Sequence, residues 1–453
     1  MIGRTKRPHH HIKTQMRANE VLLIVLVLLG VFFTLIILGV PIAVCIALSS
    51  LITLMLSMPF EFATTTLAQR LAGGLDSFTL LSIPFFVMSG YLMGRGGIAE
   101  RLIEAAKALI GTVPGGLALV NTLSCMLFGS ISGSAVAATS AIGSFMIPKM
   151  EREGYDRDFS TAVTVTGSIL GLLIPPSNVL IVYAVAAGGV SIAALFMAGY
   201  VPGIIAGVAL MLVAAAYSKK HNFPVSERIP LGVAIYKVLD AGPSIFMVVI
   251  VVVGIVAGLF TATEASAVAV VYGLALTLHY GEITVRDLPN IMLKSIETTA
   301  IVLLLIGVSS GMAWVLAYEN IPQSISDFML GISDNPVVIL LMINIILLLI
   351  GIFLDITPAI LIFTPIFLPV ATDLGMSPIH FGIMLVLNLS IGLCTPPVGS
   401  VLFVGCAVAG TTIQRLIRPL KILYLALIGV LLLVTFLPYL SEGVPNTLGL
   451  ITQ

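Results

Sequence analysis

Apolar runs long enough to cross a membrane recur along the whole chain. Val21–Val40 and Ile301–Ala317 are two of them, and about 20 apolar residues span the hydrocarbon of a bilayer as a helix. Of the 453 residues, 58% are hydrophobic and only 9% are charged, whereas about a quarter of the residues of a soluble domain are charged. The chain is therefore predicted to be an all-α polytopic membrane protein. Its net charge of zero gives no reason to expect a nucleic acid partner.

After the N-terminal tail, most Lys and Arg residues gather in five internal segments, and three other connections contain none. The segments with cations are Arg95–Lys107, Lys149–Arg157, Lys219–Lys237, Arg286–Lys294 and Arg415–Lys421, and those without are Glu319–Pro336, Asp373–His380 and the tail after Leu440. The positive-inside rule places the first group in the cytoplasm and the second outside. The N-terminus then lies outside, although residues 1–20 carry five Lys or Arg.

This topology requires two re-entrant hairpins. One apolar segment separates two cytoplasmic loops, and another, Val337–Thr372, separates two outer loops. A single crossing cannot return to the side it came from, but a re-entrant hairpin can. Irregular backbone at membrane depth is tolerated where it lines protein or water, so the two hairpins mark a functional centre.

The two halves of the sequence align without gaps at an offset of 221 residues. Ser89-Gly90 falls on Ser310-Gly311, Gly171 on Gly392, and Pro175-Pro176 on Pro396-Pro397. The first half begins outside and the second inside, so the repeats are predicted to be inverted. Inverted repeats with broken helices are typical of secondary transporters.

The repeat divides the chain into segments. We predict a basic N-terminal tail (1–20), a first repeat (21–220), a cytoplasmic linker (221–242), a second repeat (243–440) and a C-terminal tail (441–453). The first repeat is expected to contain a hairpin near 115–148 and a broken helix near 160–190. The second is expected to contain a hairpin near 337–372 and a broken helix near 380–410.

The segment Phe128–Ser144 is rich in glycine and hydroxyl residues where the first hairpin should turn. Its Ser and Thr hydroxyls, with unwound backbone carbonyls, are oxygen ligands of the kind that sodium prefers. Close helix packing through small residues is the alternative. The predicted hairpin favours ion binding.

The equivalent segment of the second half contains Asp355 inside an apolar run. A charge at membrane depth is costly and marks a functional site, although an Asp can also cap a half-helix. Each Pro pair should break its helix and free carbonyls near Gly171–Pro175 and Gly392–Pro396. An anionic substrate would favour the N–H groups of the resulting half-helix ends.

Two further segments are predicted to be structural. Glu264 follows a turn and is expected to cap the next helix. Gly96–Gly111 is amphipathic and is expected to be an interfacial helix that braces the first hairpin. The chain contains no phosphate-binding loop and no HExxH motif, so neither an ATPase nor a zinc-dependent hydrolase is indicated.

Several motifs resemble, in order, those of the large membrane subunit of TRAP (tripartite ATP-independent periplasmic) transporters, the DctM-like type. They are GSISGSAVAATSAIG, EGYDRDFSTAV, GLLIPPSNVLIVYA, GLFTATEASAVAV, DITPAILIFTPIFLPV and GLCTPPVGSVLFV. The similarity covers nearly the whole chain after the tail. Ala262, where the family usually has proline, and the basic tail are departures from it.

The resemblance implies an inverted-repeat, elevator-type transporter of the ion-transporter superfamily, in the bacterial inner membrane. It implies sodium-driven uptake of a small organic acid, such as a C4-dicarboxylate or sialic acid, with a small membrane subunit and a periplasmic binding protein as partners. No cofactor other than sodium is expected.

The resemblance also implies particular site residues. One sodium site would use Ser132, Ser134, Gly171, Ile174 and Pro176. The other would use Asp355–Thr357, including Thr357, with Gly392, Thr395 and Pro397. The substrate would lie near Asp355, Ser177 and Asn178.

Two alternatives stay open at this point. A stand-alone sodium/dicarboxylate symporter of related architecture would need no binding protein. A channel or an intramembrane enzyme is a third reading, but two closed hairpins disfavour an open pore and no nucleophile–base pair or metal-ligand set supports chemistry.

Overall fold

The structure is a computed structural model, and it describes residues 9–95, 97–111, 113–224 and 230–451. These residues form α-helices and short 3-10 helices and no β-strand. The first half contains α1 (His9–Ile37), α2 (Ile42–Ser57), α3 (Phe60–Leu75), η1 (Phe78–Leu81), α4 (Ser82–Arg95), α5 (Ile98–Ile110), α6 (Gly116–Ser132), α7 (Ala135–Arg152), α8 (Arg157–Ser168), η2 (Ile169–Leu172), α9 (Asn178–Ala186) and α10 (Ile192–Lys220). The second half contains α11 (Leu231–Val256), α12 (Ala262–Tyr280), η3 (Val285–Asp287), α13 (Leu288–Tyr318), α14 (Ile321–Ile332), α15 (Pro336–Phe353), α16 (Ile356–Asp373), α17 (Pro378–Gly392), α18 (Ser400–Ala409), α19 (Ile413–Phe436) and α20 (Tyr439–Thr447).

The helices confirm a multi-pass, all-helical membrane protein. Within the described residues, 7 helices are long and apolar enough to cross a membrane, or up to 8 if α3 and α4 form one span bent by 61°. The 7 are α10, α11, α12, α13, α15, α16 and α19.

The elements of the two halves follow in the same order and nearly the same register. α7 runs from Ala135 to Arg152, and α16 begins and ends 221 residues later in the sequence. α10 and α19 begin at the same offset, and the two Pro–Pro peptide bonds are both cis. The similarity seen in the Gly and Pro positions therefore extends to the helix boundaries.

Two helical hairpins and two broken helices interlock in the middle of the molecule. Hairpin 1 is α6–α7, hairpin 2 is α15–α16, broken helix 1 is α8–η2–α9, and broken helix 2 is α17–α18. The first arm of each hairpin packs on the broken helix of its own half, α6 on α8 and α15 on α17. The second arm packs on its own half and also on the other, α7 on α8 and α18, and α16 on α17 and α9. We call these four elements the core unit.

The core unit is almost completely buried at its centre, where buried amides hold it together. Asn121 of α6 donates to the Thr164 hydroxyl of α8 at 2.7 Å. In the other half, Asn388 of α17 donates to the side-chain oxygen of Asn344 in α15 at 2.8 Å. All of these residues are buried, and a buried polar group without such a partner would cost stability.

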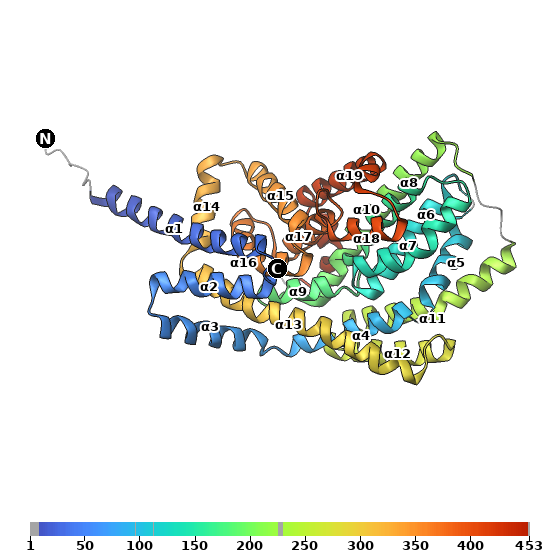
Figure 1. Cartoon of the computed structure of the whole chain (residues 1–453), viewed down its shortest axis with the longest axis horizontal. Helices are drawn as coiled ribbons and strands as arrows, with labels where there is room; N and C mark the ends of the chain where they lie inside the picture. The colour runs from blue at the N-terminus through green and yellow to red at the C-terminus, as the bar shows by residue number, and fades with distance from the viewer. Residues whose placement is uncertain (1–8, 96, 112, 225–229, 452–453) are drawn as a thin grey trace.

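A second group of helices lies against one side of the core unit. α2, α3, α4 and α12 pack on or beside the long helix α13 and form a band along the lower edge of Figure 1. α13 contacts α16 of hairpin 2, and α4 contacts α6 of hairpin 1. We call this group the scaffold band. At its edge, Thr261 and Glu264 form the predicted cap of α12, a complete capping box.

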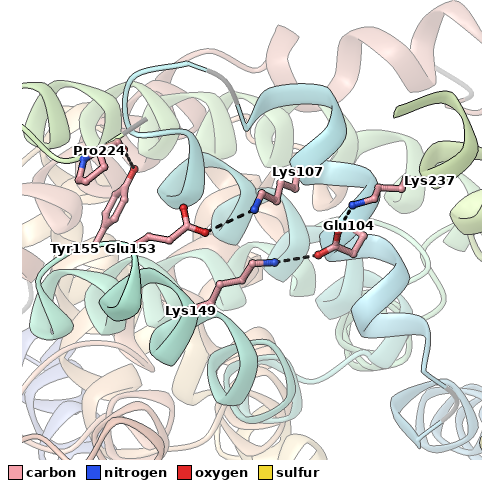
Figure 2. A network of polar contacts seen from close by, with 7 residues as sticks. All are labelled: Glu104, Lys107, Lys149, Glu153, Tyr155, Pro224 and Lys237. Atoms are coloured by element: carbon pink, nitrogen blue, oxygen red, sulfur yellow. Dashed lines mark hydrogen bonds and ion pairs between the residues drawn. The ribbon is translucent and has the colours of Figure 1, made fainter. Parts of the chain in front are cut away.

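The predicted amphipathic helix is α5, which ties hairpin 1 to α11. Its apolar side, including Leu102 and Ala106, is buried, and α5 packs on both α6 and α11. Figure 2 shows its charged side: the Glu104 carboxylate accepts from Lys149 of α7 at 2.9 Å and from Lys237 of α11 at 2.5 Å. α5 therefore braces the base of hairpin 1, as predicted.

Two further contacts extend this network. Lys107 of α5 pairs with Glu153 at 3.6 Å, and the Tyr155 hydroxyl donates to the Pro224 carbonyl at 3.0 Å. Partial burial raises the pKa of the Glu104 carboxyl, but the hydrogen bonds and charges of Lys237 and Lys149 outweigh it, so the pKa lies below its ordinary value. The carboxylate is thus held in its ionised form.

The chain ends and the central linker are more helical than their composition predicted. α1 begins at His9, inside the predicted tail, and α11 begins at Leu231, inside the predicted linker; residues 1–8 and 225–229 lie outside the described part. The predicted C-terminal tail contains α20, because Ser441 and Gly443 are buried against neighbouring helices and the Glu442 carboxylate accepts from the Ser377 hydroxyl.

Candidate functional site

A cavity of about 260 Å³ lies between the tips of the two hairpins. Its walls come from Gly133–Val136 of hairpin 1, Asp355–Pro358 of hairpin 2, the start of α9, and helices α4 and α13 of the scaffold band. We call it the tip cavity. Predicted site residues from three separate segments, Ser134, Asn178 and Asp355 with Thr357, meet here.

Three helices begin at the tip cavity. α7 begins after Ser134, α9 begins at Asn178 and α16 begins after Asp355. The α7 terminus is capped, because the Ser134 hydroxyl accepts from Ala137 N at 3.2 Å, whereas the termini of α9 and α16 have no side-chain cap. Uncapped first-turn N–H groups carry partial positive charge. None of the residues that line this cavity is Lys, Arg or His, so the helix ends are its electropositive features.

The tip of hairpin 1 is a tight turn against broken helix 1. Gly133 has φ 63°, and a Cβ there would lie 2.7 Å from Nδ2 of Asn178. The Ser132 hydroxyl donates across the turn to the Ser134 carbonyl at 3.4 Å. The structure thus brings the predicted residues Ser132, Ser134 and Asn178 together.

Broken helix 1 places backbone carbonyls behind this tip. A Cβ on Gly171 would lie 2.4 Å from Cα of Gly129, so only glycine lets the two backbones touch. No hydrogen bond within the described residues reaches the carbonyl oxygens of Ile174 or Pro176. These oxygens remain free acceptors, as an ion site requires.

Ser177, which was predicted to lie near the substrate, does not line the tip cavity. Its side chain is buried and donates to the Leu172 carbonyl. The hydroxyl satisfies a carbonyl that the Pro175–Pro176 break releases from the helix. Asn178, one residue on, faces the cavity instead.

Asp355 occupies the N-cap position of α16 and is exposed to the tip cavity. Its carboxylate lies near the Ile356 N–H but makes no side-chain capping bond. The expected capping position is therefore present without the capping bond. Most of the carboxylate's acceptor capacity stays open to a ligand.

The other residues of the predicted second sodium site lie on broken helix 2, behind hairpin 2. A Cβ on Gly392 would lie 2.5 Å from Cα of Gly351. The Thr395 hydroxyl donates to the Ile391 carbonyl at 2.7 Å and lies 3.1 Å from the Tyr424 hydroxyl. Gly392, Thr395 and Pro397 do not line the tip cavity, whereas Asp355 and Thr357 do.

One stripe of residues on α13 lines the tip cavity and two neighbouring cavities. The predictions from the sequence did not include this stripe. A cavity of about 430 Å³ beside hairpin 1 shares Ser134, Asn178 and Thr298 with the tip cavity, and another of about 720 Å³ lies against Ser309 and Ser310. The α13 residues that line them recur at steps of three and one: Thr298, Ile301, Val302, Leu305, Ile306, Ser309, Ser310 and Ala313. Such spacing is one face of a helix, and the Ser310-Gly311 repeat match was the available signal.

The comparison with protein families decides what this arrangement belongs to. The family described as the DctM component of the tripartite ATP-independent periplasmic transporter matches residues 29–440. The chain belongs to this family. It is therefore a transporter component and not an enzyme, and it resides in the bacterial inner membrane.

Individual relatives agree with this assignment. The chain is 50% identical over 422 residues to the uncharacterized protein YgiK of Salmonella typhimurium, across 93% of this chain and 97% of that protein. It is 40% identical to the C4-dicarboxylate TRAP transporter large permease protein DctM of Pseudomonas aeruginosa, across 89% and 94%. It is 39% identical to the isethionate TRAP transporter permease protein DctMQ of Oleidesulfovibrio alaskensis, across 91% of this chain and 65% of that protein.

A solved structure shares the fold at low sequence identity. Neisseria gonorrhoeae MtrF, described as one of a class of antimetabolite efflux pumps, matches with a TM-score of 0.56 and 13% identity over 82% of this chain and 84% of that one. The likeness shows a shared fold and says nothing of function or substrate.

Proposed function

We propose that the chain uses a sodium gradient to take up a small organic acid across the inner membrane, as the transport subunit of a binding-protein-dependent TRAP system. The observation that carries the proposal is the tip cavity, where three helix N-termini meet one uncapped carboxylate. The fold itself is shared with proteins of other activity, so only this site bears on the function.

The helix N-termini are suited to an anionic substrate. First-turn N–H groups and the helix dipole attract carboxylate and phosphate groups. The uncapped ends of α9 and α16 face the cavity from two sides. A substrate carboxylate is proposed to accept from these N–H groups and from Asn178.

The Asp355 carboxylate gives a reason for sodium dependence. Two anions in one small cavity repel each other strongly where water is scarce. A sodium ion bound through Asp355 and Thr357, or through hairpin 1 and the free carbonyls of broken helix 1, would offset that repulsion. Sodium binding and substrate binding then favour one another, which is the thermodynamic content of coupling.

The division of the cavity walls supports an elevator motion. The polar lining groups come mainly from the core unit, whereas the scaffold band contributes apolar side chains and one hydroxyl: Ile83, Val87, Ile301, Val302, Leu305 and Thr298. A core unit that moves along an apolar wall keeps its own contacts with substrate and sodium. We propose this motion for the chain.

The charges at the hairpin bases support insertion from opposite faces. The base of hairpin 1 carries Lys149 and Arg152, whereas the ends of hairpin 2 carry no Lys or Arg. By the positive-inside rule the first base is cytoplasmic and the second is outside. The two hairpins are proposed to be re-entrant and the two repeats inverted.

The relatives bear on the substrate class and the partners. Two of them are named for a C4-dicarboxylate and for isethionate, both small organic anions. The chain covers 65% of DctMQ, and we propose that a separate small membrane subunit does for this chain what the rest of that protein does there. A periplasmic binding protein would deliver the substrate.

Uptake into proteoliposomes tests the proposal. The chain is reconstituted alone, then with a co-expressed small membrane subunit and binding protein, and radiolabelled succinate, isethionate and sialic acid are supplied with a sodium gradient or a potassium gradient. Uptake that needs both partners and sodium is expected. Sodium-driven uptake by the chain alone would indicate a stand-alone symporter, and equal uptake with potassium would refute sodium coupling.

A further inference from the structure

Exposed cations gather where α10 ends and α19 begins. Lys219 and Lys220 close α10, and Arg415, Arg418 and Lys421 lie in the first turns of α19; all are exposed. α10 packs along α19. We call these five residues the α10–α19 basic patch.

Five other cations of the predicted cytoplasmic side are neutralised by neighbours. Arg101, Lys107, Lys149, Arg157 and Lys237 each lie in an ion pair, three of which Figure 2 shows. No cation of the basic patch is in an ion pair with another residue in the described part of the chain. The patch therefore carries net charge that the protein itself does not balance.

Two acidic residues lie near the patch, but both are engaged elsewhere. The Asp156 carboxylate caps α8 by accepting from Phe159 N at 2.7 Å. The Asp158 carboxylate accepts from the Thr411 hydroxyl at 2.5 Å. Even with both counted against it, the patch keeps an excess of positive charge.

The exposed face of α19 changes character along its length. The cations stand at three-residue spacing, and beyond them Ile422 and Leu425 are exposed by 45% and 61% on the same face. Residues three and four apart share one helix face, so this face is cationic over its first turns and apolar beyond them. That order matches the headgroup and acyl layers of a membrane leaflet.

The fold does not require these cations. The residues of α10 that lie 221 positions before Arg415, Arg418 and Lys421 are Ala194, Met197 and Tyr200, and α10 forms the equivalent helix without them. Orientation by the positive-inside rule calls for cations in the loop but not for one unpaired cluster above an apolar face. A bound anionic ligand with an apolar part would account for both the unpaired cations and the apolar face beyond them.

We propose that the α10–α19 basic patch binds the headgroup of an anionic phospholipid, whose acyl chains lie along Ile422 and Leu425. Arg418 can donate two parallel N–H bonds to phosphate oxygens, and the lysines add point charges. Basic clusters between helices at the cytoplasmic surface bind anionic lipid headgroups in this way. The inference is independent of the sodium and substrate proposals.

Native mass spectrometry of the purified full chain in neutral detergent tests the lipid site. Cardiolipin is titrated against wild type, the Arg418→Gln/Lys421→Gln variant, and the matched control Arg286→Gln/Lys294→Gln, which removes one exposed arginine and one exposed lysine at the start of α13. We expect the first variant to weaken cardiolipin binding by about tenfold or more and the control by less than about twofold. Phosphatidylethanolamine binding should be the same in all three proteins.

Other outcomes overturn the proposal. Equal cardiolipin affinity in all three proteins, or equal losses in both variants, would mean that the patch is no specific site. Competition by millimolar inorganic phosphate would identify a general anion site instead of a lipid site. If the Gln variant unfolds, Arg418→Lys/Lys421→Arg keeps both charges, and loss of cardiolipin binding in that variant or salt-insensitive binding by wild type would contradict an electrostatic headgroup site.

Discussion

The two hairpin tips face their broken helices with different residues at equivalent positions. In hairpin 1 the tip is Gly133, and the side chain of Asn178 fills the space beside it. In hairpin 2 the tip residue at the equivalent position is Leu354, and the residue equivalent to Asn178 is Gly399, whose N–H donates to the Ile352 carbonyl at 3.2 Å. The first half therefore has glycine at the tip and a side chain on the broken helix, and the second half has the reverse.

The exchange leaves the two tips chemically unequal. Ser134 uses its hydroxyl oxygen to cap α7, whereas Asp355, its equivalent, stands uncapped in the tip cavity. One repeat therefore supplies a neutral, internally satisfied tip, and the other supplies the charge. The same backbone arrangement therefore carries a neutral tip in one half and an acidic tip in the other.

Removal of the Asp355 charge should have the largest effect. Asp355→Asn keeps the side-chain shape but removes the anion proposed to hold sodium beside the substrate, so sodium-driven uptake should fall by about 100-fold or more. Uptake into proteoliposomes measures this, and the melting temperature in detergent checks folding. Undiminished uptake would remove Asp355 from the mechanism.

Ser134→Ala is the matched change in the other tip. It deletes one neutral ligand and one cap, so the sodium concentration for half-maximal uptake should rise by about three- to tenfold with little change in substrate affinity. Equal effects of the two substitutions would mean that the tips are equivalent after all.

Substitution of the glycines behind the two tips should lower the stability of the protein by similar amounts in the two halves. Gly171→Ala and Gly392→Ala each place a methyl group 2.4–2.5 Å from a backbone atom of the facing hairpin, and overpacking of this kind costs about 1–3 kcal/mol. Thermal unfolding of the purified variants measures the loss. Gly429→Ala is the control, because nothing lies within 4 Å of that position. A much smaller loss in one half would show that its hairpin can move away from the broken helix.

The smallest effect is expected for the ion pairs of Glu104 on α5, which brace the base of hairpin 1. α14, the equivalent of α5, carries Asp327 as its only charged residue. Because its pKa is lowered in the folded protein, Glu104 contributes stability above the ordinary carboxyl pKa, and this contribution is lost as the pH falls through the lowered pKa. Glu104→Gln should cost about 0.5–1 kcal/mol at neutral pH.

Thermal unfolding measured across the acidic pH range separates the contribution of the Glu104 ion pairs from a general effect of pH on stability. Glu104→Gln should flatten the low-pH decline of the melting temperature, whereas Glu100→Gln, an exposed neighbour on α5, should not. The same decline in all three proteins would mean that the ion pairs add nothing to stability.

Glycine and proline positions predicted the core unit well because they fix where helices turn and break. The predicted hairpin at 337–372 is α15–α16 to within one residue at each end, and the predicted tip region of hairpin 1 contains the observed turn at Gly133. Pro358 has no N–H to donate to the Leu354 carbonyl, and the helix breaks at that point. Backbone geometry of this kind is local and can be read from residue type.

Side-chain direction and long-range packing were not predictable in the same way. Nothing in the spacing distinguishes Ser177, which bonds to a released carbonyl, from Asn178, which faces the cavity. The stripe of α13 becomes visible only when the core unit lies against it. Composition also hid α14 and α20, whose polar residues resemble loops until neighbouring helices bury their apolar sides.

The exchange of partners between the halves constrains how the protein is made. The second arm of hairpin 1 packs on α18, so Gly143 lies against Val408, which the ribosome adds much later. Until then hairpin 1 lacks the partner that its second arm has in the second half. Such long-range contacts slow folding and expose intermediates. Membrane insertion of this chain should therefore finish after synthesis, and truncation before α18 should leave hairpin 1 open to proteolysis.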